Sequence, residues 1–341
     1  MEWWKHCSIV LAFHCLITPL LHHSVPGLTL ACHAMATRFE VVLHGDNPAA
    51  LRAAGEEALR LVEELEDQLS LFRVSSEIAQ LNARAAREPV RVTPSLFALL
   101  QQAQKLSEES SGAFDITIAP LVRCWGFMGG MGQMPSAAEV AEARAKVGMG
   151  LVQLRPENFT VRFAREGVML DLGAIGKGYA IERAAEVLRE VGVTSALLHG
   201  GTSTVQAIGQ PPGEEFWKIA IETPSPSKDI PPTLLATVPL KDEAMSVSGV
   251  WGNSFEVGGR TFGHIIDPRT GEPALGTVLA AVVLPSATET DALSTALLTL
   301  GSAGHERIAS LRPGMRTVVV SECGGRLRVE AKGIEVRGAE G

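Results

Sequence analysis

The amino-acid sequence predicts an α+β protein. In the first half of the chain, apolar residues recur at helical spacing, as in residues 51–69 and 96–106. In the second half, short alternating stretches such as 217–222 and 234–240 follow one another, separated by turn residues. Helices gathered in one part of a chain and strands in another are typical of the α+β class.

Cap and turn residues predict where the helices lie. Asn47 and Pro48 predict a helix start, because asparagine caps the first backbone N–H groups and proline suits the first turn. This helix would bury an apolar stripe from Leu51 to Leu69 and expose its acidic residues as a solvated face. Further helices are expected over 76–82, from Thr93 to Gly112, from Ser136 to Gly148, from Ile181 to Gly192 and from Ser286 to Gly301, with Ser-x-x-Glu capping boxes at Ser136 and Ser286.

Short apolar and β-branched runs predict the strands. The first strand is expected at Thr37 to Leu43, and a short one at Val168 to Leu170 would end on Asp171. The others are expected over 195–198, 217–222, 234–240, 255–257, 261–266 and 278–284, followed by a hairpin over 315–329 that turns at Gly324 and Gly325.

Composition limits the classes of function. The 341 residues carry a formal net charge of −8 and a single tyrosine, so we expect no nucleic-acid partner. The five cysteines include no C-x-x-C pair, which argues against zinc and thiol redox chemistry. The length suits one large domain or two packed subdomains.

The N-terminus differs from the rest. We expect residues 1–30 to be an apolar tail and residues 31–337 to be the folded domain. Cys7 to Leu21 is apolar but shorter than the roughly 20 residues that span a bilayer. A secretory signal and a start codon placed too far upstream both remain open. We favour export to the periplasmic side of the inner membrane over a cytoplasmic location, and we expect membrane association only through this tail.

A glycine-rich loop follows Asp171. Gly173, Gly176 and Gly178 surround Lys177 and precede an apolar helical pattern. Glycines let backbone N–H groups approach a phosphate, and a helix start adds partial positive charge. The loop matches neither common phosphate-binding motif, so a structural turn with a solvated lysine is the alternative.

Two further places carry polar groups that suit catalysis. Asp291 and Thr295, four residues apart, project from one side of a helix and offer hard oxygens for Mg²⁺, although a solvent-facing pair is the alternative. His264 stands beside the turn residues Asp267 and Pro268. It suits a general base, and a structural histidine is the alternative.

Together these segments resemble the FAD:protein FMN transferase family (ApbE), once described as thiamine-biosynthesis lipoproteins. The resemblance runs from about Met35 to Gly301. Its motifs, in family order, are Met35-Ala36-Thr37, SLFRVSSEIAQLN (70–82), GAFD (112–115), Trp125-Gly126-Phe127, DLGAIGKGY (171–179), Gly200-Gly201, Ser248-Gly249, HIIDPRTG (264–271) and DALST (291–295).

The resemblance implies an α+β fold with mixed or antiparallel sheets flanked by helices and an FAD cleft between subdomains. By position, the FAD site would comprise Met35, Phe72, Ala113, Phe114, Asp115, Asp171, Lys177 and Ile265. The backbone oxygen of Ala174, with Asp291 and Thr295, would hold Mg²⁺, and His264 would be the catalytic base.

Three positions depart from the family pattern. Phe72 stands where tyrosine is common, which keeps an aromatic face and loses a hydroxyl. Ala36 replaces a glycine, and Gly176 stands where alanine is more frequent.

The implied activity is Mg²⁺-dependent transfer of the FMN moiety of FAD to a threonine hydroxyl of a partner protein, with release of AMP. The partner would be a threonine-bearing redox subunit. One alternative is an FAD pyrophosphatase that gives free FMN and AMP. Another is a non-catalytic FAD-binding protein. The presence of Asp291, Thr295 and His264 argues against this alternative.

Overall fold

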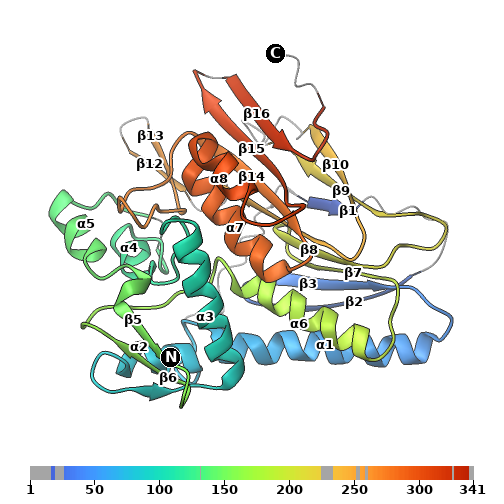
Figure 1. Cartoon of the computed structure of the whole chain (residues 1–341), viewed down its shortest axis with the longest axis horizontal. Helices are drawn as coiled ribbons and strands as arrows, with labels where there is room; N and C mark the ends of the chain where they lie inside the picture. Colours follow the sequence, from blue (N-terminus) through green and yellow to red (C-terminus); the bar gives the residue numbers. More distant parts are fainter. Residues whose placement is uncertain are drawn as a thin grey trace.

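An eight-stranded antiparallel sheet forms the centre of the molecule (Figure 1). The computed structural model describes residues 17–19, 27–130, 132–223, 233–250, 254–257, 260–324 and 326–337. The strand order is β16-β15-β14-β11-β8-β7-β3-β2. These strands are β2 (Leu28–Ala34), β3 (Thr37–Leu43), β7 (Ala196–Gly200), β8 (Thr204–Ile208), β11 (Ala244–Gly249), β14 (Thr277–Leu284), β15 (Arg316–Cys323) and β16 (Arg326–Lys332).

Both faces of the central strands are buried, which explains their nearly continuous apolar sequences. In β14, Ala280 and Val282 pack into the core on the helical side of the sheet, whereas Ala281 and Val283 pack into the core on the other side. Successive side chains of a strand point to opposite faces, so a strand covered on both sides needs apolar residues throughout.

Long helices cover one face of this sheet. They are α1 (Pro48–Leu69), α6 (Gly176–Glu190) and α7 (Ala287–Leu300), and α3 (Pro94–Glu109) packs against α7. The short α8 (His305–Ala309) follows the 3-10 turn η2 (Gly301–Gly304). In Figure 1, α6 lies between α1 and α7. This arrangement places the first turn of α6 beside α7.

A second, three-stranded sheet packs on the opposite face through the other hydrophobic core. Its order is β1-β9-β10, with β1 (Ile17–Pro19), β9 (Trp217–Glu222) and β10 (Leu234–Leu240). The molecule therefore has three layers: helices, the large sheet and the small sheet.

A smaller part with its own sheet lies beside the helices (Figure 1). The sheet has the order β4-β6-β5, and an aromatic cluster holds the neighbouring helices against a hairpin. The elements are α2 (Glu77–Arg84), β4 (Val90–Arg91), α4 (Ala119–Cys124), α5 (Ala137–Arg144), η1 (Met149–Leu151), β5 (Val152–Arg155), β6 (Thr160–Phe163) and the hairpin β12 (Ser254–Val257) and β13 (Arg260–Gly263).

The predicted α+β class is confirmed, and so are most predicted elements. The Asn47 side chain accepts a hydrogen bond from the backbone N of Ala50, as expected of a cap. The full capping box at Ser136 is present. Helix α6 ends before Gly192, whose φ of 85° places it in the left-handed region that favours glycine.

Three predictions about elements are wrong. Residues 168–170 form no strand, and the backbone of Leu170 is bound by the side chain of Asn82 rather than by a neighbouring strand. Thr37–Leu43 is not the first strand: β1 and β2 precede it, and β2 crosses the expected tail boundary at residue 30. At Ser286 only half of the capping box forms, because Glu289 pairs with Arg312 at 2.8 Å.

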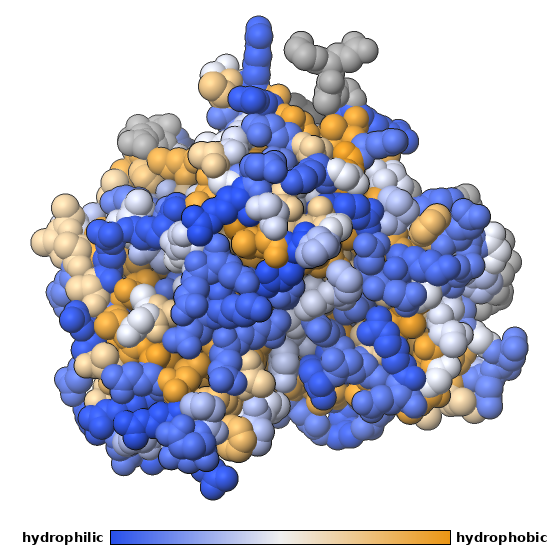
Figure 2. All heavy atoms as spheres, in the orientation of Figure 1, coloured by the Kyte–Doolittle hydropathy of each residue, from blue (hydrophilic) through white to orange (hydrophobic). Residues whose placement is uncertain are grey.

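Hydrophilic residues prevail on the face shown in Figure 2, where apolar residues lie in separate patches. Within the part of the chain that the structure describes, none of the helices has the length and apolar character required to cross a bilayer. Residues 1–16 and 20–26 of the expected tail, like Gly325 of the expected last turn, lie outside the described residues.

Candidate active site

A buried carboxylate joins the first turn of α6 to α7. Oδ2 of Asp291 accepts a hydrogen bond from the backbone N of Gly178 at 2.9 Å. Helix α6 has no side-chain cap of its own, so this carboxylate satisfies one of its free N–H groups. The negative charge also lies at the positive end of the helix dipole.

Glycine is required at position 178 by this close contact. A Cβ atom there would lie 2.2 Å from the carbonyl oxygen of Ala287 and 2.7 Å from Cβ of Asp291. The glycine-rich sequence thus allows α6 and α7 to approach each other. At Gly176, in contrast, an added Cβ would meet only Leu172 at an ordinary 3.8 Å.

Lys177 places its charge next to the same carboxylate. Its Nζ lies 3.9 Å from Oδ1 of Asp291 and donates a hydrogen bond to the carbonyl oxygen of Gly173 at 3.1 Å. Asp291 is only 4% exposed, so the solvent-facing alternative is wrong for this residue. Residues 177 and 291, far apart in the sequence, share one site.

Thr295 lies half-buried one helical turn after Asp291. Its hydroxyl donates to the backbone oxygen of Asp291 at 3.3 Å and lies 3.2 Å from Ser248 Oγ, so its oxygen keeps a lone pair to accept a further partner. Ala174 lies in the turn just before α6, three residues from Lys177.

These donors fit Mg²⁺ only in company with a phosphate. Among the described residues there is no group of three or more His, Cys, Asp or Glu side chains that could hold a metal. One carboxylate, one hydroxyl and one carbonyl are hard oxygen ligands that leave most of an octahedral shell unfilled. Mg²⁺ commonly completes such a shell with water and substrate phosphates.

Asp171 lies in the turn that leads into α6. One of its carboxylate oxygens accepts from the backbone N of Gly173 at 2.8 Å. Burial raises the pKa of Asp171, and the Gly173 N–H and the charge of Lys177 oppose that shift.

The segment before Asp171 is held by an asparagine. The Asn82 side chain both donates to and accepts from the backbone of Leu170, at 2.9 and 2.8 Å. The side-chain amide thus takes the place of a neighbouring strand, which corrects the expected strand at 168–170.

The loop after α3 buries the side chains of Ala113, Phe114 and Asp115. The Asp115 carboxylate accepts from the backbone N of Thr117 at 2.8 Å and of Met149 at 2.9 Å. Burial raises its pKa, and these hydrogen bonds oppose the shift. Because the Asp115 carboxylate oxygens already accept hydrogen bonds inside the protein, the groups that this loop can offer a ligand are mainly backbone N–H and C=O groups.

Met35 and Phe72 lie at two other turns. Met35 and Ala36 connect β2 to β3 with φ values of 50° and 58°, and Met35 packs against the helical-side core. Phe72 follows α1 in a turn where Oγ of Ser70 accepts from its backbone N at 3.2 Å. Its ring is 76% exposed, so its face is free to stack on a planar ligand.

His264 and Ile265 follow β13 and precede the predicted turn. His264 is half-buried, and its ring meets the edge of Phe127 with centroids 6.5 Å apart. The turn is built as predicted: Asp267 accepts from the backbone N and the guanidinium of Arg269, and its backbone oxygen accepts from Gly271 N at 2.8 Å.

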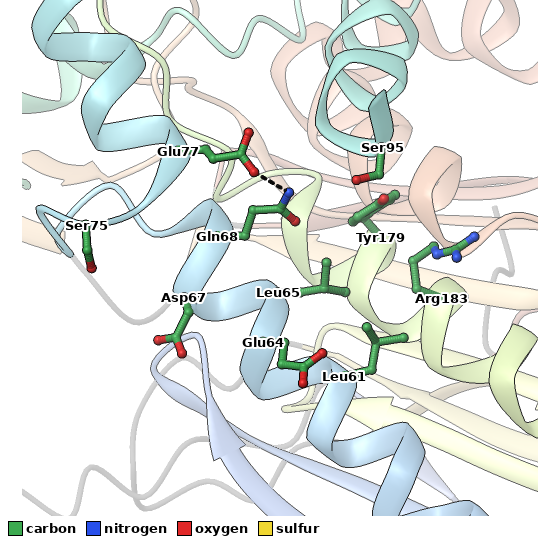
Figure 3. Close-up of a pocket in the computed structure, with 10 residues that line it drawn as sticks. All are labelled: Leu61, Glu64, Leu65, Asp67, Gln68, Ser75, Glu77, Ser95, Tyr179 and Arg183. Carbon is green, nitrogen blue, oxygen red and sulfur yellow. Dashed lines mark hydrogen bonds between the residues drawn. The ribbon is translucent and has the colours of Figure 1, made fainter. Parts of the chain in front are cut away.

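Two cavities lie away from the Asp291 site. One of about 570 Å³ contains Asp115 among its lining residues and reaches Pro268 and Arg269. The other, of about 480 Å³, lies between α1 and α6 and is lined by none of the predicted site residues (Figure 3). Its Gln68 and Glu77 bond to each other at 2.8 Å.

Sequence reasoning did not predict that a set of hydroxyl groups lies around Asp291 and α7. Thr204 of β8 donates to Oδ1 of Asp291 at 3.5 Å. Ser246 and Ser248 of β11 contact other hydroxyls of α7. The sequence signals for the two serines are the motif Ser248-Gly249 and their spacing of two residues, which places them on the same side of a strand.

Comparisons with known proteins agree on one family. The model of the ApbE family matches residues 35–319. The chain is 33% identical to an FAD:protein FMN transferase of Treponema pallidum over 78% of this chain and 77% of that protein. It is 32% identical to one of Vibrio cholerae over 71% and 72% of the two chains.

Solved structures give the same result. The flavinyl transferase ApbE of Pseudomonas stutzeri, in its apo form, is similar with a TM-score of 0.77 and 30% identity over 90% of this chain and 95% of that one. The ApbE protein of Thermotoga maritima is similar with a TM-score of 0.78 and 29% identity, over 89% and 96%.

Proposed function

We infer that this chain, which belongs to the ApbE family, is an FAD:protein FMN transferase. Its substrates are FAD and an acceptor protein. An acceptor oxygen attacks the phosphorus of the FMN half, the bond from that phosphorus to the bridging oxygen breaks, and AMP leaves with that oxygen. We propose that the acceptor oxygen is a threonine hydroxyl of a redox subunit.

The observation that best supports this function is the contact of Asp291 with the first turn of α6. The N-terminal end of α6 and the ammonium of Lys177 form a positive site next to one buried carboxylate. Lys177 would neutralise charge on the diphosphate and on the leaving AMP. Positioning and charge neutralisation are the main contributions of proteins to phosphoryl transfer.

A divalent cation would complete this site. Asp291, Thr295 and the backbone oxygen of Ala174 would hold Mg²⁺, which when bound supplies further charge neutralisation at the phosphates. The chain's own residues then orient the diphosphate between Lys177 and the N-terminus of α6.

The remaining predicted residues receive roles that suit their environments. His264 would accept the proton of the acceptor hydroxyl. Phe72 would stack its exposed ring on a planar part of FAD, and Ala113 and Phe114 would contribute backbone groups. Met35, Asp115, Asp171 and Ile265 would support or line the FAD site.

The function is tested by in-gel flavin fluorescence. The chain is incubated with FAD, Mg²⁺ and a threonine-bearing redox subunit as the acceptor protein, and the acceptor band becomes fluorescent. The matched control is the same acceptor with the proposed acceptor threonine replaced by valine, which stays dark. Free FMN and AMP without a fluorescent band would instead identify an FAD pyrophosphatase, and intact FAD would identify a non-catalytic binder.

We also propose that residues 1–26 direct export, so that the enzyme works on the periplasmic side. The apolar character of Cys7 to Leu21 supports this, whereas the pairing of Ile17–Pro19 with β9 favours retention of the segment. Sequencing the mature N-terminus decides: loss of about 26 residues supports export, and an intact N-terminus in a cytoplasmic fraction contradicts it.

A further inference from the structure

Two groups of hydroxyls extend from β11 to α7. In the inner group, Ser246 Oγ lies 2.8 Å from Thr290 Oγ1. In the outer group, Ser248 Oγ lies 2.8 Å from Ser294 Oγ and 3.2 Å from Thr295 Oγ1. Through Thr204, 3.1 Å from Ser246 Oγ, the inner group reaches Oδ1 of Asp291. The outer group contains Thr295, the hydroxyl that we propose as a metal ligand.

The hydroxyls of the outer group have fewer protons than hydrogen-bond contacts. Ser294 and Thr295 each approach the backbone oxygen of Asp291, at 3.0 and 3.3 Å, in addition to their contacts with Ser248. Three hydroxyls carry three protons for four contacts. Ser248 therefore shares one proton between two neighbours, and its position fixes how the Thr295 hydroxyl is directed.

Thr295 needs such a constraint. A helical threonine divides between two rotamers, because its hydroxyl can bond to a carbonyl of the preceding turn. Ser248 approaches from another element and favours the rotamer observed here. In that rotamer the Thr295 proton points to the backbone oxygen of Asp291, one lone pair faces Ser248, and the other lone pair is left for a further partner.

We propose that Ser248 is a positioning residue that holds the Thr295 hydroxyl ready to ligate a divalent cation. The inference rests on the proposed function, because it takes Thr295 as a ligand. Groups that orient metal ligands are worth about 10–100-fold in metal affinity. Ser248 itself touches neither metal nor substrate in this role.

The test is Mn²⁺ binding to the full chain saturated with FAD, without acceptor, with free Mn²⁺ read by electron paramagnetic resonance. We expect Ser248→Ala to weaken Mn²⁺ binding about 10-fold and to leave FAD affinity without metal unchanged. Ser321→Ala is the matched control, since Ser321 Oγ lies 3.1 Å from Ser302 Oγ elsewhere on the large sheet. It should bind Mn²⁺ like the unaltered chain.

A double-mutant cycle separates positioning from a direct or purely structural effect. If Ser248 acts through Thr295, Ser248→Ala adds no further loss in a Thr295→Ala background. An equal loss in that background would overturn the inference. Ser248→Cys keeps the size of the side chain with a weaker donor and replaces Ser248→Ala if the latter misfolds.

The two levels of the proposal fail differently. If the unaltered chain shows no FAD-dependent Mn²⁺ binding, the metal site itself is wrong, and this inference falls with it. If the unaltered chain binds Mn²⁺ and Ser248→Ala or Ser248→Cys binds it equally well, only the role of Ser248 is wrong.

Discussion

At the scale of single residues, burial decides what Asp291 can do. The sequence leaves open whether an aspartate and a threonine four apart face solvent. The structure buries Asp291 because α7 packs against both the large sheet and α6. A buried carboxylate needs partners, and the Gly178 N–H and Lys177 supply them.

Replacing Asp291 should abolish metal-dependent turnover while FAD still binds. In Asp291→Asn the side-chain oxygen can still accept from Gly178, but the amide NH₂ then turns toward Lys177 and cannot ligate a cation. We expect the rate of acceptor flavinylation at saturating FAD to fall by about 100-fold or more, with FAD affinity measured by fluorescence titration. Asp242→Asn, in an exposed turn where Oδ1 accepts from Gly209 N, is the control. Unchanged turnover would refute the metal assignment.

His264 should affect the chemical step more than binding. His264→Ala removes the proposed base, so we expect a roughly 10²-fold or larger drop in single-turnover rate and a flatter dependence of that rate on pH. Single-turnover rates measured between pH 5.5 and 9 provide the check. Rates that keep their pH dependence would mean that another group takes the proton.

At the scale of elements, the contact between α6 and α7 depends on one glycine. Gly178→Ala should force the helices apart, because its Cβ would lie 2.2 Å from a backbone oxygen. We expect a loss of about 1–3 kcal/mol in the free energy of unfolding together with weaker Mn²⁺ binding.

Gly176→Ala is the matched variant in the same turn. Its Cβ meets nothing closer than 3.8 Å, and alanine restricts the unfolded chain, so we expect a gain of about 0.5–1 kcal/mol. Urea denaturation of both variants tests the pair. Equal stability of the two would contradict the packing argument.

The turn between β2 and β3 carries a strain that a glycine would relieve. Ala36 has a φ of 58°, in the left-handed region. Ala36→Gly should raise the free energy of unfolding by about 1 kcal/mol, measured in urea. Ala34→Gly, within β2, should lower it instead, by about 0.5–1 kcal/mol. If Ala36→Gly were less stable than the unaltered chain, the left-handed backbone of Ala36 would not be a source of strain.

At the scale of the whole molecule, the two large cores lie between Leu28 and Val336. A chain that begins at Gly27 should therefore fold and keep its transferase activity. It loses β1, which covers one edge of β9, so we expect Tm to fall by no more than about 5 °C. Calorimetry of the two chains checks this, and failure of the short chain to fold would place residues before 27 in the domain.

Many of the helices and strands could be predicted because residues within or next to each element indicate it. Asn47, Ser136 and Gly192 mark helix ends through their own cap chemistry, and the alternation at 217–222 and 234–240 marks strands. Residues 168–170 could not be assigned from the sequence, because a short apolar run looks the same whether a strand or Asn82 binds its backbone. The missing half of the capping box at Ser286 depends likewise on Arg312, a distant residue.

The sequence by itself determined the fold class, most element ends and the family, because each rests on residues that act locally or on motifs in a fixed order. Only the tertiary structure decided that Lys177 and Asp291 share a site, that Asp115 turns its carboxylate inward and that Ser248 reaches Thr295. These are contacts between residues far apart along the chain, and they exist only once α6, α7 and β11 are packed together.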